Sequence, residues 1–206
     1  MDDLLGAWHT LLARYTSAAE VDDTGRGLLA RWSEPHRRYH DLAHLRAVLA
    51  AVTELADFAP DPDAVRLAAW YHDAVYAGSP DDEERSAQLA EHELAGLAVA
   101  EPLVTEVARL VRMTVEHNPA PQDGNGQVLS DADLASLALP PEQYRRNTAA
   151  IRDEYAHVPE TDFRVGRARV IASLLAAPFL FRTEAARQRW ESAARANLTA
   201  ELATLS

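Results

Sequence analysis

The sequence of 206 residues contains no cysteine and no lysine. The absence of cysteine excludes disulfide bonds and thiolate metal ligands, and it fits a cytoplasmic location, which we expect for this protein. All 20 basic residues are arginines, which we attribute mainly to coding bias. Any metal site in this chain must therefore be built from histidine and carboxylate side chains.

Long apolar runs and an excess of positive charge are missing as well. No apolar segment is long enough to cross a bilayer as a helix, and Met1-Asp2-Asp3 lacks the basic region that opens a signal peptide. The net charge is −12 and no basic stripe is visible, which argues against nucleic acid as a partner. A small anionic substrate stays compatible with this charge, because a bound dication would invert the local field.

Aromatic residues make up only 7% of the chain while hydrophobic residues make up 48%, so the core must consist mainly of Leu, Ala and Val. These residues recur at helical spacing, and no strand alternation or fixed repeat is present. The sequence predicts an all-α fold of about ten helices. The expected helices cover 3–18, 24–33, 41–58, 63–77, a segment that begins at the acidic run 81–84, 101–117, a short helix near 131–138, 140–157, 161–177 and 183–204.

We expect one domain over residues 1–206, with a core at about 35–140 and C-terminal helices at 141–206 packed on it. The segment 119–127 is rich in proline and glycine, which predicts a loop at the rim of a site or a lid over it. The last helix, 183–204, either packs on its own domain or forms the contact of a homodimer.

One stretch of the chain places an imidazole beside a carboxylate. His72 and Asp73 follow the apolar segment 67–70, so the pair is expected to be buried. Burial of both groups is costly unless something compensates their charge and polarity. A divalent metal is one compensation and a salt bridge to arginine is the other, and the pair alone does not decide between them.

Further metal-capable residues lie on both sides of this pair. His40 and His44 are four residues apart, so they lie on one face of a helix. Their side chains point either into one pocket or into solvent. Asp131 and Asp133 are expected at the start of a helix, where Asp is also an ordinary capping residue. They point in nearly opposite directions, so only one of them can reach a metal directly. His117 ends a helix. There a protonated imidazole would interact favourably with the helix dipole, or the side chain would contribute to a functional site.

Taken in order, these blocks resemble the HD-domain superfamily of metal-dependent phosphohydrolases, in a branch described only as predicted metal-dependent HD phosphohydrolases. The resemblance spans roughly residues 35–200. It has one departure: the glycine expected after the Asp-x-Asp-Leu block is replaced by Ala138 or Leu139. The similar blocks are Arg38–His44, Tyr71–Tyr76, Glu83–Ala87, Asp131–Leu134, Ile151–Tyr155, Gly166-Arg167 and Ala194–Leu198.

The resemblance implies a ligand set for one divalent metal ion. His44, His72 and Asp73 would be ligands, with Asp133 as the fourth and Asp131 as its alternative. The ion would be Mn, Ni, Co, Zn, Fe or Mg, since histidine and carboxylate ligands serve several metals. The additional histidines would allow a second ion.

The resemblance also implies catalytic roles around this ion. His40 and His117 would face its open side, where either could protonate a leaving oxygen, and Asp73 could hold the attacking water. Arg38, or its neighbour Arg37, would clamp a phosphate, and Glu84 would orient a metal-bound water.

Hydrolysis of a small phosphate ester or phosphoanhydride, in the first place a nucleotide, is therefore the leading hypothesis. Two others remain. One is oxygen chemistry at a pair of irons, which some HD-like proteins perform. The other is a module without catalysis that binds a nucleotide or another small ligand.

Overall fold

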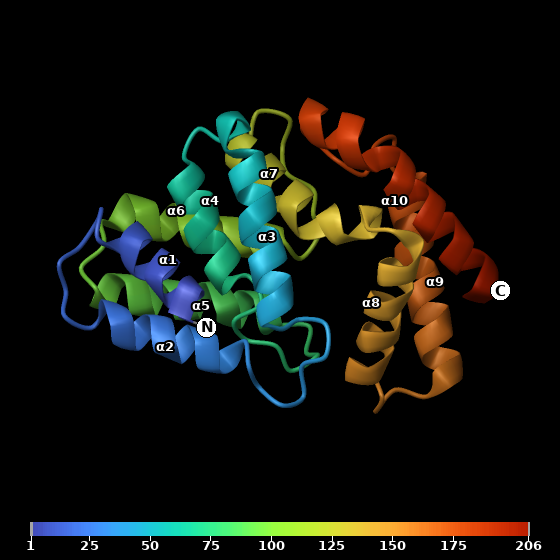
Figure 1. Ribbon diagram of the computed structural model, residues 1–206, viewed down its shortest axis with the longest axis horizontal. Coiled ribbons are helices and arrows are strands. Elements are labelled where there is room, and N and C mark those ends of the chain that lie inside the picture. Colours follow the sequence, from blue (N-terminus) through green and yellow to red (C-terminus); the bar gives the residue numbers. More distant parts are fainter. Residues whose placement is uncertain (1, 206) are drawn as a thin grey trace.

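The computed structural model describes residues 2–205, and over these residues it is helical without strands (Figure 1). This confirms the all-α prediction. The described part contains ten α-helices and two short 3-10 helices: α1 (Asp2–Leu12), α2 (Val21–Arg31), α3 (Leu42–Glu54), η1 (Ala56–Phe58), α4 (Pro62–Tyr71), α5 (Asp82–Gly96), α6 (Glu101–Met113), α7 (Gly124–Leu134), η2 (Ala135–Ala138), α8 (Pro141–Glu154), α9 (Glu160–Ala176) and α10 (Glu184–Leu205).

Helix α4 lies at the centre of the N-terminal bundle, where it packs against α3, α5, α6 and α7 (Figure 1). Its apolar sequence explains this position, because every residue from Asp63 to Tyr71 except Arg66 is buried. The indole of Trp8 packs edge-on against Trp70 at a centroid distance of 5.3 Å. A helix that is apolar on nearly all sides is stable only inside a bundle, so the residues at its C-terminal end are held in the interior as well.

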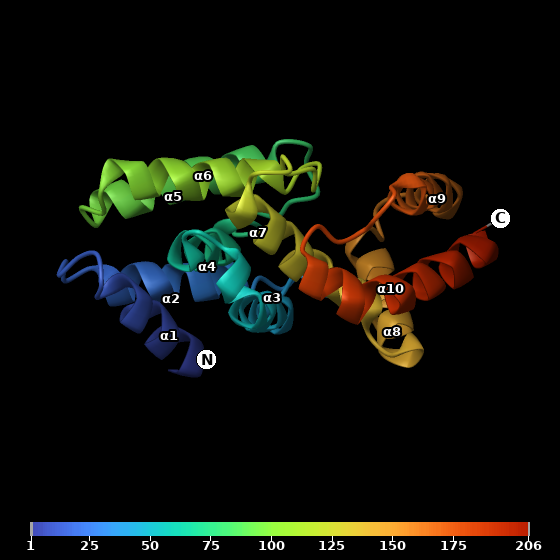
Figure 2. The ribbon, with the colours of Figure 1, turned by 90° about the horizontal axis from the view of Figure 1, so that it is seen from above.

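Helices α8, α9 and α10 form a separate group beside this bundle, joined to it through η2 (Figures 1 and 2). Asn197 of α10 donates from Nδ2 to the carbonyls of Leu137 and Leu139 at 2.8 Å. Ala194 and Leu198 on the same helix are buried, so α10 packs on its own chain. The division into a core and an extension stays a prediction, as does a homodimer.

The predicted loop at 119–127 and the predicted short helix near 131–138 are wrong in their bounds. Helix α7 begins at Gly124, and Asp123 caps it by accepting from the N–H of Gly126. A Cβ on Gly124 would lie 2.7 Å from Cδ of Pro60, so this glycine allows close packing of a helix rather than a flexible loop.

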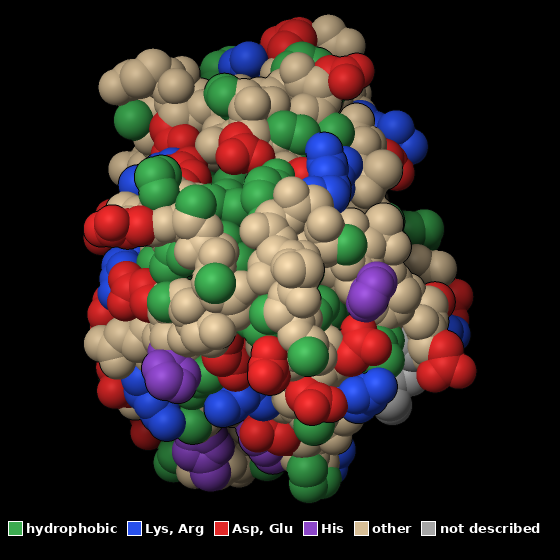
Figure 3. Space-filling model, turned by 90° about the vertical axis from the view of Figure 1, so that its left-hand side faces the viewer, with side chains coloured by type: hydrophobic (Ala, Val, Ile, Leu, Met, Phe, Trp, Pro, Cys, Tyr) green, Lys and Arg blue, Asp and Glu red, His purple; other side chains and the backbone are tan. Residues whose placement is uncertain are grey.

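Charged side chains of both signs are interspersed on the face of the molecule shown in Figure 3, and they form no continuous basic surface there. Among the described residues, no helix is both long enough and apolar enough to cross a membrane.

Candidate metal centre

His72 and Asp73 lie in the turn that follows α4. The N–H of His72 still donates to the carbonyl of Ala68 at 2.9 Å, so His72 closes the helix. Because Asp73 lies beyond the helix, its side chain is not confined to the helical spacing of about 100° per residue. The two neighbours therefore reach the same point, with His72 Nε2 3.3 Å from Asp73 Oδ2.

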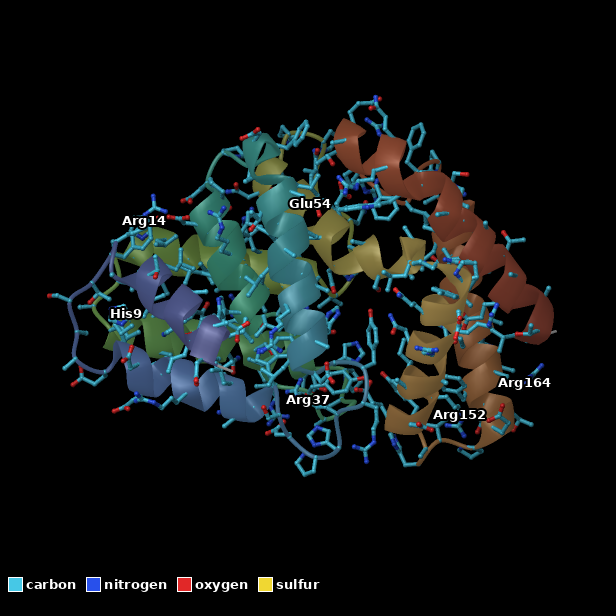
Figure 4. All side chains as sticks on the ribbon, viewed as in Figure 1. His9, Arg14, Arg37, Glu54, Arg152 and Arg164 are labelled. Carbon is cyan, nitrogen blue, oxygen red and sulfur yellow. The ribbon has the colours of Figure 1, made fainter. Side chains whose placement is uncertain are left out.

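Arg37 holds this turn from the loop that precedes α3 (Figure 4). Its guanidinium is buried and donates to the backbone carbonyls of His40 at 2.9 Å, Asp73 at 2.8 Å and Ala74 at 3.2 Å. It lies 5.3 Å from the ring centroid of Trp32. These contacts use the positive charge of Arg37 for structure, so it is not available to clamp a phosphate.

Two imidazoles and two carboxylates converge on one point. His44 Nε2 lies 3.3 Å from His72 Nε2, 3.0 Å from Asp133 Oδ1 and 3.8 Å from Asp73 Oδ2. His72 Nε2 lies 3.5 Å from Asp133 Oδ1. Ligand bonds of about 2.0–2.2 Å place neighbouring donors roughly 3.0–3.5 Å apart. The donor atoms therefore have the separations of a coordination polyhedron.

The protonation of His72 also supports a metal site at this point. Its Nδ1 donates to the carbonyl of Ala69 at 2.9 Å, so a neutral His72 presents the lone pair of Nε2 to the other donors. Burial disfavours a charge on His72, but the carboxylates of Asp73 and Asp133 raise its pKa well above the usual range. The cluster thus requires a positive charge at its centre, and a divalent cation fits this donor set.

His117 lies on the other side of Asp133, with its Nε2 3.3 Å from Asp133 Oδ2. It follows α6 in a left-handed conformation, with φ at 47°, which is uncommon for a residue other than glycine. Its Nδ1 is buried and has no hydrogen-bond partner in the described part of the chain. Burial lowers the pKa of His117, so a neutral imidazole faces the centre.

His40 is held by Glu154, a residue that the sequence did not single out. Glu154 Oε1 accepts the backbone N–H groups of Arg38, Tyr39 and His40 at 2.8–2.9 Å. Its Oε2 accepts from His40 Nδ1 at 2.7 Å and from the hydroxyl of Tyr76 at 3.1 Å. In the sequence, Glu154 is marked only by its place in a block that resembles the HD family. This block did not indicate what Glu154 does.

Glu154 and His40 change each other's ionisation. Burial opposes both charges, yet the hydrogen bonds from His40 and from the backbone lower the pKa of Glu154 to about 2. The hydrogen bond to Glu154, together with the charge of Asp73, raises the pKa of His40 against the same effect of burial. The contact with Glu154 therefore favours the protonated form of His40 beside the centre.

Asp131 is not a ligand, which corrects the alternative that the sequence left open. Its Oδ1 accepts from the N–H of Arg182 at 2.6 Å, and its Oδ2 accepts from the N–H and the hydroxyl of Thr183 at 2.7 and 2.8 Å. The carboxylate thus caps the start of α10. Asp133, two residues further along α7, points to the histidines, as the helical geometry requires.

Two predicted catalytic residues lie away from the centre. Glu84 pairs with Arg112 at 2.7 and 2.8 Å on the surface of α5 and α6, so it cannot orient a metal-bound water. Arg38 is exposed and folds back onto the carbonyl of Pro35, so it cannot clamp a phosphate. The neighbouring Glu83 is partly buried, and burial together with the charge of Asp73 raises its pKa.

A cavity of about 580 Å³ opens next to the centre. Asp133, His117 and His40 line its inner end, and Tyr39 lines the same side. Helices α8 and α9 form the opposite wall. A small molecule in this cavity would therefore touch the second oxygen of Asp133 and both outer histidines.

A family model described as HD domain matches residues 41–137. This segment includes His44, His72, Asp73 and Asp133. Residues 41–137 therefore match an HD domain, as the ordered histidine and aspartate blocks predicted. No curated protein and no solved structure matches the chain.

Proposed function

We propose that the protein is a metal-dependent phosphohydrolase that acts on a small phosphate ester or phosphoanhydride. One observation carries this proposal: two imidazole nitrogens and two carboxylate oxygens converge at 3.0–3.8 Å beside a cavity of about 580 Å³. The HD domain supports the same class of activity, because metal-dependent hydrolysis is general for that domain.

His44, His72, Asp73 and Asp133 would hold one divalent ion. When bound, such an ion lowers the pKa of a coordinated water and polarises a phosphoryl oxygen. Four protein ligands leave room for water and substrate only if the ion accepts more than four, which Mn, Ni, Co, Fe and Mg do readily.

The two outer histidines would then divide the proton transfers. His40 donates from Nδ1 to Glu154, a contact that raises its pKa and favours protonation of Nε2 as well, so this nitrogen could donate to a leaving oxygen. His117 has a lowered pKa and a buried, unpartnered Nδ1, so it can accept a proton or orient water. A pair of groups whose environments push their pKa values apart is typical of acid–base sites.

The test is hydrolysis of p-nitrophenyl phosphate and a panel of phosphate esters and nucleotides by protein loaded with each metal in turn. Turnover with at least one metal is expected, and Asp73→Asn should abolish both the stoichiometric metal and the turnover. Glu101→Gln, at an exposed position of α6, is the matched control and should keep both. Full metal occupancy without turnover of any substrate would overturn the proposal.

The di-iron alternative has less support from the geometry. Of the two outer histidines, only His117 pairs with a carboxylate of the centre, through Nε2 at 3.3 Å from Asp133 Oδ2, while His40 pairs with Glu154. We therefore propose one ion per chain. Two irons per chain on elemental analysis would favour the oxidative alternative, and ligand binding without turnover would favour a module without catalysis.

A further inference from the structure

We propose that the substrate is a phosphate monoester whose alcohol part is apolar, rather than a nucleoside di- or triphosphate. This proposal rests on the proposed function and narrows the range of substrates for the same site. Three features of the described cavity lining carry it: the composition of its outer wall, the absence of an unpaired arginine, and the prior engagement of most of its hydroxyl groups.

The wall opposite the metal centre is apolar. It is built by side chains of α8, α9 and the turn between these helices: Ile151, Val158, Phe163, Val170 and Leu174. Leu134 and Leu137 continue this surface toward Asp133. A molecule whose phosphate lies at the centre must therefore place the rest of its body against hydrocarbon, and burial of apolar surface is favourable only when the ligand is apolar there.

Among the residues that line the cavity, Arg167 is the one arginine, and it is already paired. Its Nε and a terminal nitrogen bind the carboxylate of Glu201 at 2.7 and 3.0 Å. Arg152, at the end of α8, donates to Glu160 and is not part of the lining (Figure 4). Recognition of a polyphosphate uses several arginine or lysine contacts, and the cavity has none to spare.

The balance of charge in the cavity also disfavours a di- or triphosphate. One dication would be neutralised by Asp73 and Asp133, and the cavity lining adds a further carboxylate, Asp162. A single phosphate can approach the ion at the centre. Each further phosphate would lie beyond the ion, where the described lining offers no unpaired arginine and adds the negative charge of Asp162.

The hydroxyl groups of the lining are largely occupied within the protein, whereas the side-chain amide of Asn147 has no hydrogen-bond partner in the described part of the chain. The hydroxyl of Tyr39 bonds that of Ser136 at 2.6 Å, and the hydroxyl of Tyr144 donates to Glu201. Thr148 donates to a carbonyl of its own helix at 3.0 Å. A ribose that bound through these hydroxyl groups would have to break their bonds, whereas an alkyl or aryl group would leave them intact.

Binding of non-hydrolysable phosphonates tests the proposal without requiring turnover. Titration calorimetry with the linear series from methyl- to hexylphosphonate, on protein loaded with Mn²⁺, should show Kd falling about fourfold for each added methylene. Adenosine 5′-monophosphate and a non-hydrolysable triphosphate analogue should bind more weakly than hexylphosphonate. A flat series, or tighter binding of either nucleotide, would overturn the proposal.

Two variants of α9 show whether this dependence arises in the cavity. Val170 lines the cavity and is 52% exposed, while Val165 on the same helix is 51% exposed and does not line it. Val170→Asp should weaken hexylphosphonate binding about tenfold and leave methylphosphonate binding unchanged. Val165→Asp should leave both unchanged, and equal effects of the two variants would refute the assignment of the wall.

Hydrolysis then separates this proposal from the one on which it rests. Faster turnover of hexyl or phenyl phosphate than of any nucleotide supports both. Faster turnover of a nucleotide overturns the apolar substrate and leaves the phosphohydrolase in place. Graded phosphonate binding with no turnover of any ester overturns the phosphohydrolase and supports the apolar cavity.

Discussion

Replacing Asp131 and Asp133 by alanine, one at a time, should separate a structural carboxylate from a metal-binding one. The two residues lie on one turn of α7 and carry the same charge. Asp131 accepts three hydrogen bonds at the start of α10, whereas Asp133 faces His44 and His117. The first replacement should lower stability, and the second should remove the response to metal.

The magnitude for Asp131→Ala follows from its three partners. A hydrogen bond to a charged group contributes about 1.5–3 kcal/mol, so three would give about 5–9 kcal/mol. Two effects reduce this sum. The backbone of Arg182 is only partly buried and water can replace its acceptor, and burial raises the pKa of Asp131, which shows that its charge is costly to bury. We expect a loss of about 2–4 kcal/mol, or roughly 4–16 °C in Tm.

The assay is thermal unfolding followed by circular dichroism, with and without Mn²⁺. A metal at a hundredfold excess over its Kd stabilises the folded state by about 2.7 kcal/mol, so Tm should rise on addition of metal for the wild type and for Asp131→Ala. It should not rise for Asp133→Ala. Asp153→Ala, exposed on α8, controls for the loss of one charge. A folded Asp131→Ala protein without the metal response, or an Asp133→Ala protein that retains it, would refute the assignment.

Three further outcomes are expected. Glu154 has a pKa of about 2 against an ordinary 4.5, so its contribution to stability is present above pH 4.5 and is lost as the pH falls toward 2. Acid denaturation of Glu154→Gln should accordingly lose less stability over that range than the wild type. A Cβ on Gly25 would clash with Trp8, while one on Gly27 meets nothing within 4 Å. Urea unfolding should show a loss of about 1–3 kcal/mol for Gly25→Ala and a gain of up to about 1 kcal/mol for Gly27→Ala, and equal values would contradict the packing. Asn197→Ala should cost about 1–3 kcal/mol in the same measurement, since it removes two buried hydrogen bonds.

The helical fold could be predicted from sequence because apolar residues recur at a period that only a helix satisfies. The prediction failed at Gly124 and Gly126, which lie inside α7. Glycine marks a turn in most local contexts, but Gly124 gives room for Pro60, which is 64 positions earlier. A contact over such a distance leaves no local pattern.

The clustering of His44, His72, Asp73 and Asp133 was predictable to a similar degree. The histidines and aspartates that converge are the ones whose residue types suit a metal, and the direction of Asp133 relative to Asp131 follows from helix geometry. The position of Glu84 was not predictable in the same way, because it is fixed by a pair with Arg112, 28 positions away on another helix. The role of Glu154 could not be predicted, since its partners lie 78 to 116 positions away.

The metal donors and the apolar wall come from different stretches of the chain. The donors lie between His44 and Asp133, whereas the wall opposite them comes from Ile151 to Leu174. Mutations in α8 and α9 can therefore alter which molecule fits the cavity without altering the proposed metal donors. A library of variants confined to these two helices would be a direct route to new substrate preferences, provided that Glu154 is left in place to hold His40.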